Sequence, residues 1–247
     1  MSSSASVPFF YLLSFALLLQ AQTILGDDPL YYICSKAGKP FPKNGTYDTN
    51  LKKVLDNLSM NAPKTGFANS SAGGGKDNVA FGLALCRGDT NFTDCKNCIA
   101  DARTELHNQC GNNRSAIVWY DYCLLKYSDK SFFGMVDEKN RVYLINVFNL
   151  TNSTSFVNTT LDFLSGLSQR AVKSEKLYYA GEAELCEFLT LYGLVQCSRD
   201  LTTENCTKCL DDAIADLPKY SANRQGGRTL YASCNVRYEI YPFVKDD

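Results

Sequence analysis

Two stretches of the chain, CRGDTNFTDCKNC at residues 86–98 and CSRDLTTENCTKC at residues 197–209, share the cysteine spacing C-x8-C-x2-C. One further cysteine follows each stretch at the same distance, and the second set lies 111 residues after the first. The apolar and aromatic residues around the cysteines repeat with the same displacement. A fixed displacement of this kind is typical of a tandem duplication. The sequence therefore predicts two copies of one domain, at 27–140 and 141–247.

Each copy has the residue pattern of an α+β unit. From Cys206 onward, apolar residues recur at the spacing of one helical face until Pro218, which should end the helix, and the first copy repeats this face from Cys95. Leucines at helical spacing around 51–58 and 161–167 indicate an earlier helix in each copy. Strand-like segments rich in aromatic and β-branched residues lie at 116–127, 141–148 and 228–242. We expect two tandem disulfide-stapled domains, each with two helices on an antiparallel sheet.

Two cysteines of the first copy have no counterpart in the second. Cys34 and Cys110 correspond, by displacement, to Ile145 and Ser221. Because two partners that are absent together are what one missing bond would leave, we infer a disulfide between Cys34 and Cys110 in the first copy only. The other four cysteines of each copy allow three pairings, and the spacing does not choose among them.

A metal or redox site is the alternative interpretation of C-x2-C. Zinc needs four ligands, usually two such pairs or one pair with histidines, whereas each copy has one pair and the chain has a single histidine, His107. We therefore interpret the cysteines as structural disulfides and expect no metal and no cofactor. A Gly-rich phosphate loop, a G-x-S-x-G motif and an acidic metal cluster are also missing from the sequence, so we expect that the protein is not an enzyme.

The N-terminus is typical of a secretory signal peptide. Residues 1–26 carry no charged side chain, and their apolar run at 9–19 is shorter than the roughly 20 residues that span a bilayer. We expect cleavage after Ala21 or Gly26 and a secreted, extracellular (apoplastic) protein without a membrane anchor. Sequons for N-glycosylation agree with this route and begin at Asn44, Asn57, Asn69, Asn91, Asn113, Asn149, Asn152, Asn158 and Asn205.

The cysteine count of 11 is odd, so at least one thiol of the monomer is unpaired. Cys186 is the candidate free thiol because it falls outside the repeat, where its counterpart is Gly75. We interpret it as a buried cysteine that packs like a small hydrophobic residue. The alternatives are a reactive thiol or an intermolecular disulfide, which would make a homo-oligomer.

Charge argues against nucleic acid as a partner. The chain has 25 basic and 26 acidic residues and a net charge of −1, and it contains no cluster of five or more Lys and Arg. The electrostatic attraction that phosphate backbones require therefore has no source in this sequence.

Motifs beyond the cysteines resemble a known family. The tandem C-x8-C-x2-C, YGLVQC at 192–197, QGGR at 225–228 and SCNVRYE at 233–239 resemble the plant cysteine-rich repeat secretory proteins. Their repeated unit, also called the stress-antifungal or ginkbilobin-homologous domain, forms the ectodomain of cysteine-rich receptor-like kinases and plasmodesmata-located proteins. The resemblance implies a five-stranded antiparallel sheet with two helices per domain. It also implies the disulfides Cys34–Cys110, Cys86–Cys95, Cys98–Cys123, Cys197–Cys206 and Cys209–Cys234.

Single-domain ginkbilobin-type members of this family are mannose-binding antifungal lectins, which use an Asn, an Arg and a Glu at fixed distances from the cysteines. In the second copy the resemblance places this set at Arg228, Glu239 and Asn146, with Asn149 as the alternative to Asn146. In the first copy the three positions hold Ser35, Ile117 and Ser128, so the set is lost there. The alternative role of Arg228 and Glu239 is a structural ion pair between neighbouring strand positions.

The sequence thus predicts a non-catalytic binding module of plant defence or stress signalling. The loss of the sugar set in the first copy favours a protein partner, such as a cell-surface receptor ectodomain. The retained Arg228 and Glu239 support the alternative, an antifungal lectin whose second domain binds mannose or another cell-wall or fungal glycan.

Overall fold

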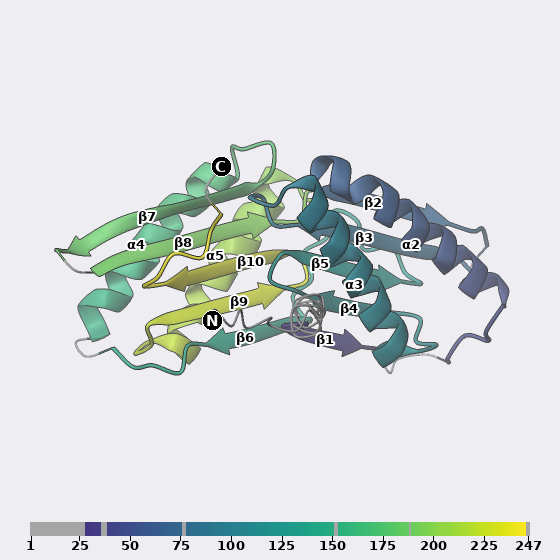
Figure 1. The fold of residues 1–247 in the computed structure, drawn as a ribbon, viewed down its shortest axis with the longest axis horizontal. Coiled ribbons are helices and arrows are strands. Elements are labelled where there is room, and N and C mark those ends of the chain that lie inside the picture. Colours follow the sequence, from purple (N-terminus) through teal and green to yellow (C-terminus); the bar gives the residue numbers. More distant parts are fainter. Residues whose placement is uncertain (1–27, 36–38, 76–77, 151–152, 188, 246–247) are drawn as a thin grey trace, which may run out of the picture.

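A computed structural model describes residues 28–35, 39–75, 78–150, 153–187 and 189–245. The expected signal peptide lies outside these residues. Two five-stranded antiparallel sheets, one from each copy, make up the fold, and two helices cover one face of each sheet (Figure 1). The predicted α+β class with two tandem domains is confirmed.

The two copies have the same order of elements. The first consists of β1 (Tyr31–Cys34), α2 (Thr46–Thr65), β2 (Phe67–Ala72), β3 (Ala80–Cys86), α3 (Phe92–Cys110), β4 (Ala116–Trp119) and β5 (Cys123–Ser128). The second consists of β6 (Arg141–Ile145), α4 (Ser153–Ala171), β7 (Tyr178–Cys186), β8 (Leu189–Cys197), α5 (Thr203–Ser221), β9 (Gly226–Tyr231) and β10 (Cys234–Glu239). The sheet orders are β1-β4-β5-β3-β2 and β6-β9-β10-β8-β7, so the second sheet repeats the first strand by strand.

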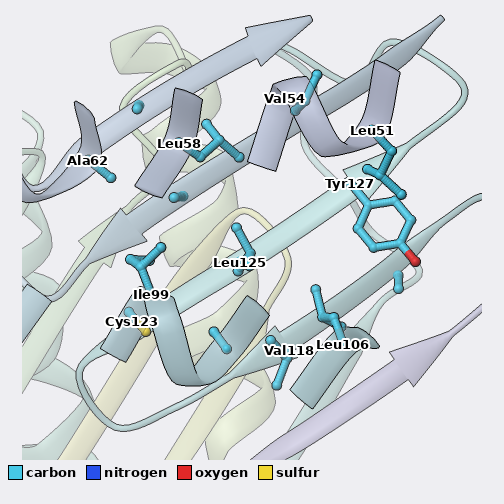
Figure 2. Close-up of a cluster of buried hydrophobic side chains, with 14 of the residues drawn as sticks. Leu51, Val54, Leu58, Ala62, Ile99, Leu106, Val118, Cys123, Leu125 and Tyr127 are labelled. Carbon is cyan, nitrogen blue, oxygen red and sulfur yellow. The ribbon is translucent and has the colours of Figure 1, made fainter. Parts of the chain in front are cut away.

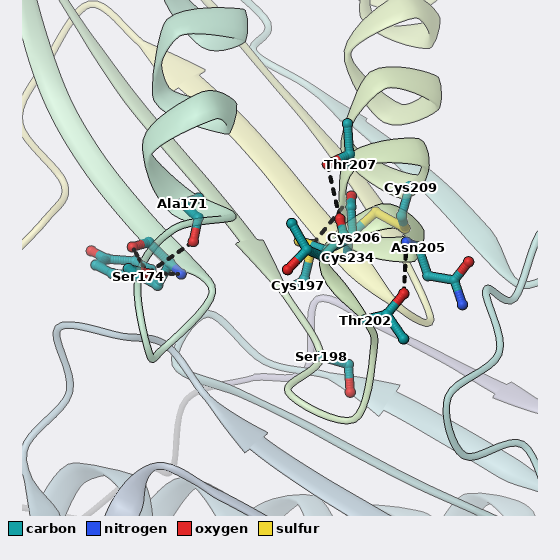
Figure 3. Close-up of a disulfide and its surroundings, with 12 residues drawn as sticks. Ala171, Ser174, Cys197, Ser198, Thr202, Asn205, Cys206, Thr207, Cys209 and Cys234 are labelled. Atoms are coloured by element: carbon teal, nitrogen blue, oxygen red, sulfur yellow. Dashed lines mark hydrogen bonds between the residues drawn. A yellow bond between two sulfur atoms is a disulfide. The ribbon is translucent and has the colours of Figure 1, made fainter.

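The repeated cysteine motif fastens the second helix of each copy to two strands. Cys95, in the first turn of α3, is bonded to Cys86 at the end of β3, and Cys98 is bonded to Cys123 at the start of β5. The second copy repeats both bonds, as Figure 3 shows, with the pairs Cys197–Cys206 and Cys209–Cys234. With Cys34–Cys110, the structure contains the five pairs that the family resemblance implied.

Helices α3 and α5 both start at a side-chain cap. The side-chain oxygen of Asn91 accepts a hydrogen bond from the backbone N–H of Asp94, and that of Thr202 accepts one from Asn205. Such caps satisfy backbone N–H groups that have no partner within the helix. The helix therefore begins just before the two cysteines, which places both in its first turns, next to the sheet.

Helix α5 does not end where the sequence predicted. Pro218 lies inside the helix, which continues to Ser221, so the prediction that the proline terminates it is wrong. Proline removes one backbone donor and usually disrupts a helix interior. Here it lies within the last turn, and the buried residues Leu217 and Ser221 on either side keep that turn against the sheet.

Each domain has its own hydrophobic core between helices and sheet. In the first copy Val54 and Leu58 of α2 and Ile99 of α3 pack on Leu125 and Tyr127 of β5 (Figure 2). All five side chains are buried. Because side chains alternate across a strand, the residues between these positions point to the opposite face of the sheet.

Those opposite faces of the two sheets pack against each other. In Figure 1 helices α2 and α3 lie in front of the first sheet, whereas α4 and α5 lie behind the second. Trp119 and Leu230 belong to the apolar cluster between the sheets. The Trp119 indole N–H donates to the Tyr231 carbonyl at 3.2 Å, and the Lys126 ammonium donates to the Ala232 carbonyl at 2.9 Å. Burial here lowers the pKa of Lys126.

The contacts between the domains are reciprocal. Arg199 Nη1 donates to the Thr65 carbonyl at 2.7 Å, and Lys176 Nζ donates to the Gly88 carbonyl at 2.9 Å. At the repeat displacement, Thr65 corresponds to Lys176 and Gly88 corresponds to Arg199. The contact between Thr65 and Arg199 is thus repeated, with the two copies exchanged, by the contact between Lys176 and Gly88. A two-fold symmetric dimer has contacts of this kind. An internal pseudo-two-fold axis therefore relates the two copies.

The Cys34–Cys110 bond ties the edge strand β1 to the end of α3. In the second copy the polar network around Asp216 of α5 makes the corresponding connection to the edge strand β6. The Asp216 carboxylate accepts from the Tyr143 hydroxyl at 2.5 Å, from the Tyr231 hydroxyl at 2.6 Å and from the Lys219 ammonium at 2.5 Å. A covalent link is therefore replaced by hydrogen bonds to a charged group.

Candidate functional site

The predicted sugar-binding residues lie on two strands of the second sheet and directly after a third. Arg228 of β9 lies opposite Arg237 of β10, and Glu239 lies opposite Gly226. Asn146 follows β6 directly, and β6 pairs with β9. Because residues two apart in a strand share a face, Arg237 and Glu239 point to the same side of the sheet, away from α4 and α5. This is the side on which the first copy docks.

Asp121, from the turn between β4 and β5 of the first copy, contacts three arginines. Its carboxylate accepts from Arg228 Nη1 at 2.6 Å, from Arg87 Nη1 at 3.0 Å and from Arg237 Nη1 at 3.1 Å. Arg87 and Arg228 are buried. Hydrogen bonds between ionised partners are stronger than neutral ones. We call these four residues the interdomain ionic cluster, because they come from both copies.

The cluster shifts the pKa values of its members. Burial alone would raise the pKa of Asp121, but the charges of Arg228, Arg87 and Arg237 outweigh it and lower that pKa below its usual range. Burial lowers the pKa of Arg228 to about 10, against the opposing effect of Asp121. At neutral pH both groups are therefore charged.

Glu239 is held by other partners than Arg228. Its Oε1 accepts from Arg237 Nε at 3.2 Å, and its Oε2 accepts from Asn146 Nδ2 at 3.2 Å. The ion pair that the sequence suggested between Arg228 and Glu239 is therefore wrong: Asp121 takes the place of Glu239. The Glu239 carboxylate lies over Gly226, where a Cβ atom would be 1.7 Å from Oε2. The first glycine of the QGGR motif thus makes room for the acid.

The three residues that the resemblance singled out do come together. Arg228, Glu239 and Asn146 all line a cavity of about 380 Å³ at the domain interface, together with Asp121, Leu30, Leu144, Ile145, Arg237 and Tyr241. Asn149 is not among the lining residues; it forms a bridge with Arg224 instead. The cavity offers carboxylate and amide groups, a guanidinium and an aromatic ring, which together suit a polar ligand.

Exposed apolar residues line this cavity or follow its lining residue Asn146 in the chain. Ile145 and Tyr241 belong to the lining and expose 47% and 44% of their surface, and Val147 and Phe148, directly after Asn146, expose 76% and 64%. We call these four residues the apolar rim. Large exposed apolar side chains that gather in one place mark interaction sites more often than scattered ones do.

The corresponding positions of the first copy cannot form such a site. Ile117 is buried in the cluster between the two sheets. Ser35 and Ser128 carry neither a guanidinium nor a carboxylate. The sugar set therefore exists once in the chain.

The sequence pattern did not identify three residues of the interdomain ionic cluster, which are Asp121, Arg87 and Arg237. At the repeat displacement Asp121 corresponds to Ala232 and Arg87 to Ser198. The available signal was that only one copy carries a charged residue at these positions. This signal does not reveal which residue the charge contacts. The docking of the two copies creates the cluster.

The remaining sequence candidates lie elsewhere. Cys186 is an exposed free thiol at the end of β7, so the interpretation of a buried cysteine is wrong. It lies on the edge strand β7, next to the turn to β8, opposite Leu189. His107 is exposed on α3. The side-chain amide of Asn205 donates to the Gly134 carbonyl at 2.9 Å, whereas the sequon residues Asn44, Asn69 and Asn158 are exposed.

Comparison with known proteins agrees with the fold. The salt stress response/antifungal family model matches residues 33–130 and 145–241. The chain is 47% identical to an antimicrobial ginkbilobin-2-like protein of Castanea crenata, covering 94% of this chain and 95% of that protein. It is 42% identical to the cysteine-rich repeat secretory protein 38 of Arabidopsis thaliana, over 99% of both.

Solved structures show the same tandem architecture. The tandem DUF26 ectodomain of the Arabidopsis thaliana cysteine-rich receptor-like protein PDLP5 is 27% identical, with a TM-score of 0.72 over 87% of this chain and all of that one. The corresponding ectodomain of PDLP8 shares the fold, with a TM-score of 0.77 at 22% identity, over 88% of this chain and all of that one. Within the described residues, no helix has the length and apolar composition needed to cross a bilayer. The chain belongs to the salt stress response/antifungal family and is a secreted, extracellular cysteine-rich repeat protein with two DUF26 domains in tandem.

Proposed function

We propose that the protein is a non-catalytic binding module that recognises a protein partner at the plant cell surface, in defence or stress signalling. The observation that carries the proposal is the apolar rim beside the polar cavity. Aromatic and aliphatic side chains around a few polar groups are the usual composition of a binding hot spot. The likeness to a receptor-like ectodomain supports a receptor ectodomain as the kind of partner.

The interdomain ionic cluster favours a protein over a sugar. A sugar-binding arginine needs free donors for hydroxyl groups, whereas Arg228 Nη1 donates to Asp121 and Arg228 Nε donates to Asn235 at 3.0 Å. Its side chain is buried. Arg228 thus serves the contact between the two copies, whereas the rim residues are exposed and accessible to a partner.

The test is a panel of purified plant receptor-kinase ectodomains, measured by surface plasmon resonance. We expect at least one of them to bind the wild type, and Phe148→Asp to weaken that binding by about tenfold or more, the usual loss at a hot spot. Met60→Asp is the matched control, because Met60 is equally exposed on α2 of the first copy. If no ectodomain binds, or if Met60→Asp is as damaging, the proposal fails.

A second candidate function rests on the cavity itself. Asn146 and Glu239 face it together with Tyr241, so a mannose-type glycan could bond its hydroxyls to the amide and the carboxylate. An antifungal lectin would act in this way.

A glycan array separates the two functions. Asn146→Ala is a better variant than Arg228→Ala, because loss of Arg228 would also deprive Asp121 of a partner. Mannose binding that disappears in Asn146→Ala and survives in Phe148→Asp would support the lectin. The absence of any glycan signal from the wild type would eliminate it.

A further inference from the structure

A separate cleft between the domains collects positive charge. It has a volume of about 270 Å³ and is lined by the end of α2, by the segment after β3 and by residues of the second copy that contact them. Lys64 comes from the first copy, and Lys176 and Arg199 come from the second. The reciprocal contacts of Arg199 with Thr65 and of Lys176 with the Gly88 carbonyl cross this cleft. It therefore lies beside the pseudo-two-fold axis.

The three cations have neutral partners. Lys64 Nζ donates to the side-chain oxygen of Asn61 at 2.9 Å, and Lys176 and Arg199 donate to backbone carbonyls. Among the described residues none of the three pairs with a carboxylate, and no acidic residue is among those that line the cleft. Elsewhere on the surface, cations do pair: Lys208 lies 2.5 Å from Glu138.

A fourth cation of the cleft is already neutralised. Arg87 lines it too, but its guanidinium bonds both oxygens of Asp89, at 2.7 and 2.8 Å, and also Asp121. The positive potential therefore comes from Lys64, Lys176 and Arg199. Like charges held close together without counter-ions cost free energy, and an anionic ligand would remove that cost.

An aromatic ring lies at the same cleft. Phe92, at the start of α3, is among the lining residues and exposes 55% of its surface. An exposed ring offers a flat apolar face on which the C–H face of a sugar ring packs. The lining thus combines a stacking surface with three charge-assisted donors.

We propose that this cleft binds an acidic oligosaccharide, one whose sugar rings carry carboxylates as in uronic acids. The cations would bond the carboxylates and Phe92 would pack on a ring. A small anion such as phosphate would use the cations alone, and so would an acidic peptide without a ring. The aromatic residue is therefore the feature that favours a charged sugar, and the secreted location places the cleft where cell-wall polysaccharides occur.

The test uses the mature, disulfide-bonded protein and a fluorescently labelled oligogalacturonate, with anisotropy measured at low and at high salt. We expect binding that weakens as salt rises, because exposed charges are screened. Lys64→Gln should weaken it by about tenfold, the effect of losing one charge-assisted contact. Among the described residues, the bond of the Lys64 ammonium is to Asn61 of its own helix, so this variant should leave the domain contacts intact.

Phe92→Ala should weaken binding as well, and Lys208→Gln, which removes an exposed lysine outside the cleft, should not. Phe148→Asp should leave oligogalacturonate binding unchanged, which separates this proposal from the proposed function. The proposal is overturned if wild type fails to bind. It is also overturned if polyglutamate or inorganic phosphate competes as well as oligogalacturonate while Phe92→Ala has no effect, because the site would then select negative charge alone.

Discussion

At the scale of single residues, Gly226 and Asp121 decide what the site can do. Gly226 gives the Glu239 carboxylate its position, and Asp121 occupies Nη1 of Arg228, a donor that a ligand would need. Neither role depends on a positive backbone φ angle; both depend on close approach between side chains or between a side chain and the backbone. The polar site is therefore set by packing as much as by charge.

Gly226→Ala should displace the Glu239 carboxylate, since the added Cβ would lie 1.7 Å from Oε2. The loss of the bonds to Arg237 and Asn146 with the steric strain should cost about 1–3 kcal/mol of unfolding free energy. Urea denaturation measures it. Gly166→Ala is the matched control, because nothing lies within 4 Å of its added Cβ on α4, so this change should be neutral or stabilising. Equal effects at the two glycines would contradict the account.

At the scale of elements, the second copy holds its edge strand without a third disulfide. Tyr143 of β6 bonds Asp216 of α5 and also stacks on Tyr220, with ring centroids 3.7 Å apart. In the first copy the corresponding strand β1 is bonded through Cys34 to Cys110. One fold thus uses two different links between an edge strand and a helix.

Asp216→Asn should destabilise the protein at neutral pH by about 2 kcal/mol, the value of hydrogen bonds to a charged group. Burial raises the pKa of Asp216, but hydrogen bonds from Lys219, Tyr143 and Tyr231 outweigh it and lower that pKa to about 2. The stabilisation is therefore complete above about pH 4, the ordinary value. It is lost as pH falls towards 2.

Urea denaturation as a function of pH tests this. The wild type should lose the contribution of Asp216 as pH falls from about 4 to about 2, and Asp216→Asn should lack that part of the pH dependence. Asp212→Asn, on the exposed side of α5, should behave like the wild type. A pH profile of Asp216→Asn that parallels the wild type would count against the network.

The Cys34–Cys110 disulfide should stabilise the first copy. Mass mapping of the mature protein should find five disulfides and one free thiol, at Cys186. Replacing Cys34 and Cys110 with serine should cost roughly 4 kcal/mol on the chain-entropy model, measured by thermal unfolding. Cys186→Ser is the control, since this exposed thiol has no bond to lose. Cys34 paired with any other cysteine would contradict the repeat argument.

Some of these features could be predicted and others could not, for physical reasons. The cysteine spacing and the alternation of strand residues are local, so the repeat and the α+β class follow from the sequence. Pro218 was misjudged because tertiary packing outweighs a local preference in the last helical turn. Asp121 was missed because its partners Arg228 and Arg237 belong to the other copy, and no local pattern encodes how two domains dock.

At the scale of the whole molecule, the two duplicated domains form one unit. The sheets share an apolar cluster, the reciprocal contacts follow a pseudo-two-fold axis, and Asp121 gathers arginines from both copies. The asymmetry lies in the residues that only one copy carries. The cavity beside Glu239 and the cleft lined by Lys64, Lys176 and Arg199 both lie between the two copies.

The most direct test of this central claim is the calorimetric unfolding of wild type and Asp121→Ala. The wild type should unfold in a single transition. Asp121→Ala leaves the buried Arg87 and Arg228 without this carboxylate and should lose about 3 kcal/mol of stability, because a buried charge without its partner is costly. The domains of the variant should then begin to unfold separately. Two independent transitions in the wild type, or a variant as stable as the wild type, would contradict the claim that Asp121 joins the two copies.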